Sequence, residues 1–128
     1  MNDKEKIDGR LLRQQEIYNE VHTDLIYSAI ELLQNPEIDQ KKINVSMIGK
    51  NAGTSVATAY NHFPNNMVDV CGAIFNSGFQ GVEKELAEYF KSVEDPKSRI
   101  NKFIELQAEV IIELGAAARY MFFNVNEI

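Results

Sequence analysis

The sequence predicts an all-α protein with about six helices and no strand. Apolar residues recur at spacings of three and four along most of the chain, and no long run alternates with period two. The three prolines stand only where a helical pattern is interrupted, so they separate helices and do not kink them. A chain of 128 residues is long enough for one globular domain with a real core.

The first predicted helix covers residues 18–33. Its apolar residues fall on one face of a helix, and they are Tyr18, Val21, Leu25, Ile26, Ala29, Ile30, Leu32 and Leu33. The pair Asn35-Pro36 ends this helix, because the residue before a proline is pushed out of the helical region. The following residues, 36–42, are polar and form a connection.

Two short helices are predicted next, with a tight turn between them. Asn44 is a suitable N-cap for the first, and Ser55 is one for the second. Gly53 supplies the left-handed backbone conformation that the turn requires. Pro64 stops the second short helix.

A longer helical pattern runs from Asn65 to Phe90, and Asp95-Pro96 then begins another helix that lasts until Gly115. The residues after Gly115 either continue that helix or form a new one. Three glycines, at 72, 78 and 81, are costly inside a helix at about 1 kcal/mol each. We expect them to permit close helix crossings, with a flexible joint as the alternative. In either case alanine at positions 78 and 81 is expected to raise helix stability.

Composition limits the classes of function. Thirteen basic and nineteen acidic residues give a formal net charge of −6, and residues 1–65 hold seven basic against nine acidic ones. Charge alone therefore disfavours nucleic-acid binding. The single cysteine, Cys71, cannot form an intramolecular disulfide, and no apolar stretch approaches the ~20 residues that cross a bilayer. We expect a soluble cytoplasmic protein that does not enter a membrane.

The most informative stretch is residues 44–63. Two short helices with this spacing have the dimensions of a helix-turn-helix, whose second helix fits the major groove of DNA. Side chains early in the second helix can face base edges, and these are Val56, Ala57, Thr58 and Asn61. Neutral donors suited to phosphate oxygens are Thr58, Tyr60 and His62. Phe63 is better explained as a core residue, whereas Asn61 also fits a local role near a helix end.

The order Ala52-Gly53, Ser55, Thr58, Tyr60 and His62-Phe63 resembles the TetR family of bacterial transcriptional regulators. The resemblance covers roughly residues 20–75. It implies a DNA-binding domain over residues 1–65, and a helical region for effector binding and dimerisation, which looks shortened, over residues 66–128. It also implies that the threonine, tyrosine and histidine contact the DNA backbone.

The sequence departs from the family pattern in its charges. Asn66 stands where the family usually has a lysine, and Lys50 is the only lysine or arginine between residues 43 and 65. We therefore expect few ionic contacts and a shallow salt dependence. The expected DNA contacts are Lys50, Ser55, Val56, Ala57, Thr58, Tyr60, Asn61, His62 and Asn66.

The C-terminal half offers a weaker candidate site. An apolar effector pocket could be lined by Phe75, Phe79, Phe103, Met121 and Phe122, although aromatic residues at helical spacing fit an ordinary core better. The family's later dimerisation helices look missing. The small and apolar stretch 114–123 is the candidate surface for a homodimer.

The main hypothesis is a transcriptional regulator, in which a dimeric, ligand-released repressor binds a palindromic DNA operator. The alternative is a helical ligand-binding or protein-interaction module with weakened DNA binding. An enzyme is the least supported class, because His22, His62 and Cys71 are far apart in the sequence and no metal-ligand spacing or phosphate-binding loop occurs. No cofactor or metal is expected.

Overall fold

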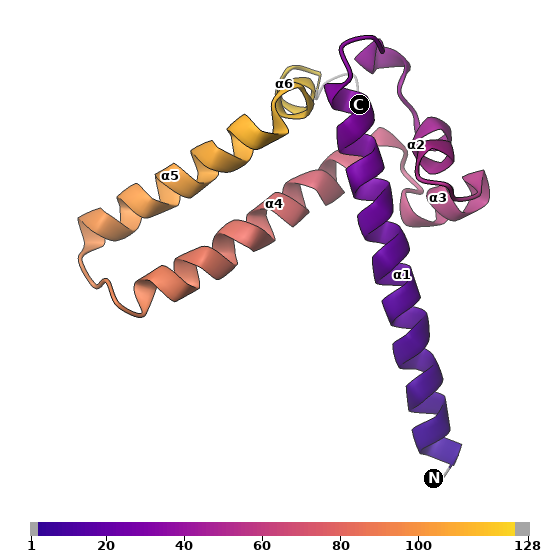
Figure 1. Cartoon of the computed structure of the whole chain (residues 1–128), viewed down its shortest axis with the longest axis horizontal. Coiled ribbons are helices and arrows are strands. Elements are labelled where there is room, and N and C mark those ends of the chain that lie inside the picture. Colours follow the sequence, from indigo (N-terminus) through magenta and orange to yellow (C-terminus); the bar gives the residue numbers. More distant parts are fainter. Residues whose placement is uncertain (1–2, 125–128) are drawn as a thin grey trace.

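The computed structural model describes residues 3–124, with side chains from residue 9 onward, and this part of the chain is helical without strands. Six α-helices and one 3-10 turn follow one another. Their bounds are α1 Asp3–Gln34, η1 Gln40–Lys42, α2 Val45–Asn51, α3 Val56–His62, α4 Met67–Phe90, α5 Pro96–Leu114 and α6 Ala116–Phe123. In Figure 1, α2 and α3 lie beside α1, while α4 and α5 form a hairpin that extends from its other side. The predicted all-α class is confirmed.

The helix α1 is much longer than predicted, because it begins at Asp3 and not near Tyr18. Residues 10–20 are all exposed, including Leu11, Leu12 and Ile17. Helix formers such as Arg, Gln, Glu and Leu allow this segment to stay helical without a buried face. A prediction based on an apolar stripe therefore misses it. The segment projects beyond α2 and α3 (Figure 1).

The main core takes its buried residues from α1, α2, α3, α4 and α6 and from residues beside them, and the partly buried Leu114 of α5 packs against it. Leu25, Ala29 and Leu33 of α1 are fully or almost fully buried. Around them pack buried residues of the other helices: Val45, Ile48, Ala59, Phe63, Val70, Ile74, Ala117 and Tyr120. Because Ala117 and Tyr120 belong to α6, this core contains residues from both sides of the boundary expected at residue 65.

The hairpin of α4 and α5 depends on one glycine. A Cβ built at Gly78 would lie only 2.9 Å from Val110 Cγ1, so the helices approach too closely there for a larger residue. The predicted role in close packing is thus confirmed for Gly78. It is wrong for Gly72 and Gly81, where a Cβ would meet nothing within 4 Å. The predicted start of α5 is also confirmed, since the Asp95 side chain accepts a hydrogen bond from Ser98 N.

Helix α6 folds back against the C-terminal end of α1. Gly115, at a φ of +52°, separates it from α5, so the chain begins a new helix at this point. The Gln34 side chain of α1 donates to the carbonyls of Glu113 and Leu114, at 3.1 Å and 2.8 Å. The Gln40 side chain donates to the carbonyl of Ala116 at 3.0 Å. These bonds attach the end of α5 to α1 and the start of α6 to η1.

None of the helices, within the residues described, is long and apolar enough to cross a membrane.

Candidate nucleic-acid interface

The ends of α2 and α3 form as their capping residues predict. Asn44 accepts a hydrogen bond from Met47 N at 2.9 Å, and Ser55 accepts one from Thr58 N at 3.1 Å. Gly53 has a φ of +77°, which is the left-handed conformation expected at this turn. The turn therefore follows from three residues that the sequence identified.

Gly49 sets the close approach of α2 to α3, and the sequence analysis missed it. A Cβ at Gly49 would lie 2.7 Å from Ala59 Cβ and 3.2 Å from Thr54 Oγ1. The sequence did contain a signal. A glycine inside a helix lowers the stability of the helix, so its presence in a short helix indicates that close packing requires it. The contact fixes α3 against α2.

A buried hydroxyl ties α2 to α1. Ser28 Oγ donates to the carbonyl of Ile48 at 2.8 Å and accepts from Asn51 Nδ2 at 2.9 Å. Ser28 is buried, and a buried hydroxyl without partners would be destabilising. These two bonds hold α2, and through it α3, at a defined position on α1.

The outer face of α3 is uncharged. Ala59 is buried and faces the core, as does Phe63 just beyond the helix. On the opposite face Ala57, Tyr60 and Asn61 are exposed, at the i, i+3 and i+4 positions that share one side of a helix. Tyr60 is 39% exposed, so its ring rests partly on the protein while its hydroxyl can reach solvent.

The other predicted contact residues differ in their solvent exposure. Val56, Thr58 and His62 are half-buried, whereas Ser55 and Lys50 are exposed. Ser55 Oγ also donates to Thr58 Oγ1 at 2.8 Å, so the two hydroxyls lie together at the start of α3. Val56 and Thr58 are thus less exposed than Ala57 and Asn61, and their contact with DNA stays a prediction.

His62 is held against α1. Its Nδ1 lies 3.0 Å from Nδ1 of His22, and its ring stacks on Tyr18 with the centroids 4.2 Å apart. His22 and His62 are far apart in the sequence, as noted above, but the packing of α3 on α1 brings their rings together. Burial, and then repulsion from His22, lower the pKa of His62 from its ordinary value of 6.5.

The segment after α3 contains a strained backbone. Asn66 has a φ of 59° and a ψ of −137°, which makes it the one non-glycine residue with positive φ in the part of the chain described. It precedes α4, which begins at Met67 and not at Asn65 as predicted. Asn65 N donates to Asp69 Oδ2 at 2.7 Å, so a carboxylate of the chain itself already lies at the start of α4.

Charge is distributed unevenly around this site. Between Asp39 and Asp69 the sequence has three lysines, at positions 41, 42 and 50, and no carboxylate side chain. The net charge of the N-terminal half conceals this local excess. The segment that carries α2 and α3 is thus locally basic, although the whole chain is acidic.

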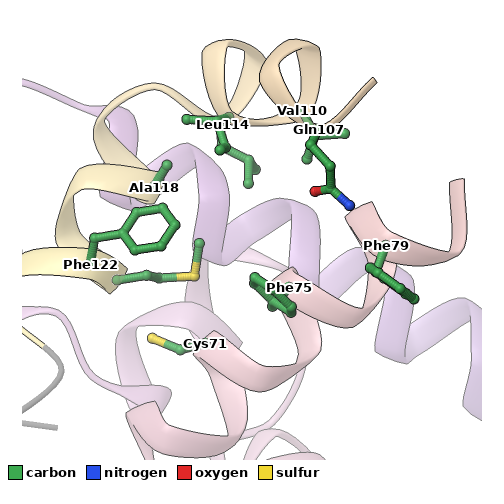
Figure 2. A pocket seen from close by; sticks show the side chains of 10 residues that line it. Cys71, Phe75, Phe79, Gln107, Val110, Leu114, Ala118 and Phe122 are labelled. Atoms are coloured by element: carbon green, nitrogen blue, oxygen red, sulfur yellow. The ribbon is translucent and has the colours of Figure 1, made fainter. Parts of the chain in front are cut away.

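A second candidate site lies between α4, α5 and α6. A cavity of about 530 Å³ is lined by Cys71, Phe75, Phe79, Gln107, Val110, Ile111, Leu114, Ala118, Met121 and Phe122. Figure 2 shows the Phe75 and Phe122 rings on either side of this space. Four of the predicted pocket residues line it, whereas Phe103 does not. Burial raises the pKa of the Cys71 thiol, which therefore stays protonated.

The aromatic residues of this region are not ordinary core residues. Phe75, Phe79, Phe103 and Phe122 are exposed, which contradicts the expectation that most of them are buried. The reason is that α4 and α5 cover each other on one side only, and α6 borders the other side around the cavity without burying these rings. Among the described residues, no group of three metal-binding side chains is found.

Comparison with protein-family models, curated proteins and solved structures finds no match.

Proposed function

We propose that the chain is a sequence-specific DNA-binding transcriptional regulator in which α2 and α3 act as a helix-turn-helix and α3 enters the major groove. The observation that carries this proposal is the exposed, uncharged face of α3 within a segment that has three lysines and no carboxylate side chain. The resemblance of the same residues to TetR-family regulators supports it.

The outer face of α3 offers groups that suit base edges. The Asn61 amide can both donate to and accept from an adenine edge, and the Ala57 methyl can contact a thymine methyl. The hydroxyls of Ser55, Thr58 and Tyr60 can donate to phosphate oxygens, which positions the helix without reading sequence. His62 has a different role in this proposal, because its contacts with α1 hold the end of α3 in place.

Electrostatics should contribute modestly to binding. Lys50, exposed in the last turn of α2, is the lysine closest in sequence to α3. A protein that neutralises few phosphates shows a shallow salt dependence and weak non-specific affinity. We therefore propose that two copies act together on a two-fold symmetric site, since one such unit alone would bind weakly.

The cavity beside α6 is the proposed effector site, and it suits a small apolar ligand. Its volume of about 530 Å³ lies within the range of small-molecule pockets. Helix α6 contacts both the cavity and the core. Ala118, Met121 and Phe122 line the cavity. Ala117 and Tyr120 pack in the core with α1. A ligand that moves α6 would thereby move α1 relative to the hairpin and release a repressor from its operator.

The alternative function is a ligand-binding or protein-interaction module without DNA binding. The apolar cavity favours this alternative, and so does the acidic charge of the chain as a whole. A module of this kind would bind an apolar ligand but would show equal, weak affinity for all DNA. We propose no catalytic role for His22 and His62, because their Nδ1 atoms face each other and Tyr18 covers the ring of His62.

The proposal is tested by nuclease footprinting on the DNA that flanks the protein's own gene, over a range of salt and protein concentrations. We expect protection of a two-fold symmetric site at low protein concentration. Equal affinity for unrelated DNA of the same length, or no binding at low salt, would contradict it and favour the alternative.

A further inference from the structure

One side of the α4–α5 hairpin carries an apolar face that stays exposed among the residues described, although α6 borders it at the cavity. We define this face by six residues: Phe75, Phe79, Ile100, Phe103, Ile104 and Ile111. Phe75, Phe79 and Ile111 line the same cavity, so they share one side of the hairpin. Helical spacing puts the other three on the side of α5 that also carries Gln107 and Ile111. Each of the six side chains is between 42% and 60% exposed.

Three carboxylates of the hairpin lie on its other side. Glu85, Glu109 and Glu113 line a separate hollow together with Tyr27 and Gln34 of α1. The six residues that define the apolar face are themselves uncharged, although the chain carries a net charge of −6. Two copies that meet through these residues would bring apolar side chains together and leave those three carboxylates outside the contact.

The size of the apolar face is sufficient for an interface. With ~200 Å² for a fully exposed side chain of this size, the six residues expose roughly 600 Å². A stable interface buries about 800 Å² from each partner, so these six residues would supply most of it. An exposed apolar patch of this extent lies at the upper end of what monomeric proteins show, where such patches are often functional.

We infer that a second copy of the chain covers the apolar face, so that two α4–α5 hairpins form a four-helix bundle across a two-fold axis. Such an isologous contact uses the same patch on both copies, and two antiparallel helices from each are what a bundle requires. The partner would also lie over the cavity, because Phe75, Phe79 and Ile111 belong to both. The effector site would then be closed only in the dimer.

This surface differs from the one expected from the sequence. Within the stretch 114–123, Ala117, Ala118 and Tyr120 are buried and cannot contact a partner, whereas Phe122 and Phe123 are exposed. The inference deepens the proposed function, which requires two copies, but it depends on contacts that are independent of DNA. Its test therefore contains no DNA.

The test is sedimentation velocity of the full chain over a hundredfold range of concentration. We expect a mass of twice 14.5 kDa, falling toward 14.5 kDa only on dilution. The substitution Ile104→Glu places a charge in the centre of the apolar face and should weaken dimerisation at least tenfold. The matched control is Ile112→Glu, on the same helix and 77% exposed but about 100° around the axis from Ile111, which should stay dimeric.

Circular dichroism checks that both variants keep the helix content of the unsubstituted chain. A monomer at every concentration, or a dimer unaffected by Ile104→Glu, overturns the inference. Binding of such a monomer to neutral phospholipid vesicles would assign the face to lipid instead. A dimer that binds no specific DNA would leave the inference intact and contradict only the proposed function.

Discussion

The Nδ1 atoms of His22 and His62 lie 3.0 Å apart and join the middle of α1 to the last turn of α3. A hydrogen bond between two imidazole nitrogens needs a proton on one of them and a free lone pair on the other. Tyr18 stacks on the same ring, with its centroid 4.2 Å from that of His62. The position of α3 therefore depends on a contact that acid can break.

Acidification is expected to destabilise the fold through His62. Its pKa is lowered from 6.5, so the unfolded chain binds more protons than the folded one as the pH falls. The stability that neutral His62 contributes to the fold is fully present above pH 6.5 and is lost as the pH falls below that value. Urea unfolding at pH 7.5 and 5.5 should show a smaller loss of stability for His62→Gln than for the unsubstituted chain. Equal losses in the two proteins would exclude this role.

Two glycines in α4 are expected to respond in opposite directions to alanine. Gly81→Ala should raise the free energy of unfolding by about 1 kcal/mol, because the position is exposed and a Cβ there meets nothing within 4 Å. Gly78→Ala should lower it, contrary to the expectation from the sequence, because the new Cβ would lie 2.9 Å from Val110 Cγ1. Urea unfolding of both variants measures the difference, and stabilisation by both would contradict the packing of α4 on α5.

Asn66 stores backbone strain that glycine should relieve. Asn66→Gly is expected to raise the free energy of unfolding by about 1 kcal/mol, since the conformation at φ 59° and ψ −137° is one that glycine adopts readily. The control is Asn65→Gly, which removes the side-chain bond from Asn65 Nδ2 to Asp69 Oδ1 and should not stabilise. Thermal unfolding of the two variants distinguishes strain at residue 66 from a general benefit of glycine in this loop.

Lys50 is expected to contribute affinity without specificity. Lys50→Gln should weaken binding to all DNA sequences alike and reduce the slope of log K against log salt by about 1 if the lysine contacts a phosphate. Lys84→Gln is the matched control, because Lys84 is equally exposed but lies on α4, away from α3. Fluorescence anisotropy at several salt concentrations measures both slopes, which should differ only for Lys50.

The parts of the fold that could be predicted are those with a local cause. Asn44, Ser55 and Asp95 act as caps and Gly53 adopts the turn conformation, because each depends only on the few residues beside it. Contacts between distant segments left no such signal. His22 and His62 are 40 residues apart, and only the packing of α3 on α1 brings them together.

In the candidate sites too, features with a local cause could be predicted and features that depend on packing between helices could not. Asn61 and Tyr60 could be selected from their place in a short capped helix, and both are exposed. The exposure of Phe103 could not be predicted, because the apolar pattern of α5 is the same whether its stripe faces the core or an interface. The length of α1 was missed because its residues 10–20 bury no apolar stripe.

The central claim, that α3 reads DNA sequence, is tested most directly by the affinity of Asn61→Ala for the footprinted site and for single-base variants of it. The matched control is Asn76→Ala, an exposed asparagine on α4. If Asn61 bonds to one base, the substitution should cost about 1–3 kcal/mol on the footprinted site and remove the preference at one position. The control should bind as the unsubstituted protein does. An unchanged affinity and base preference in Asn61→Ala would contradict the assignment of α3 as the helix that reads DNA.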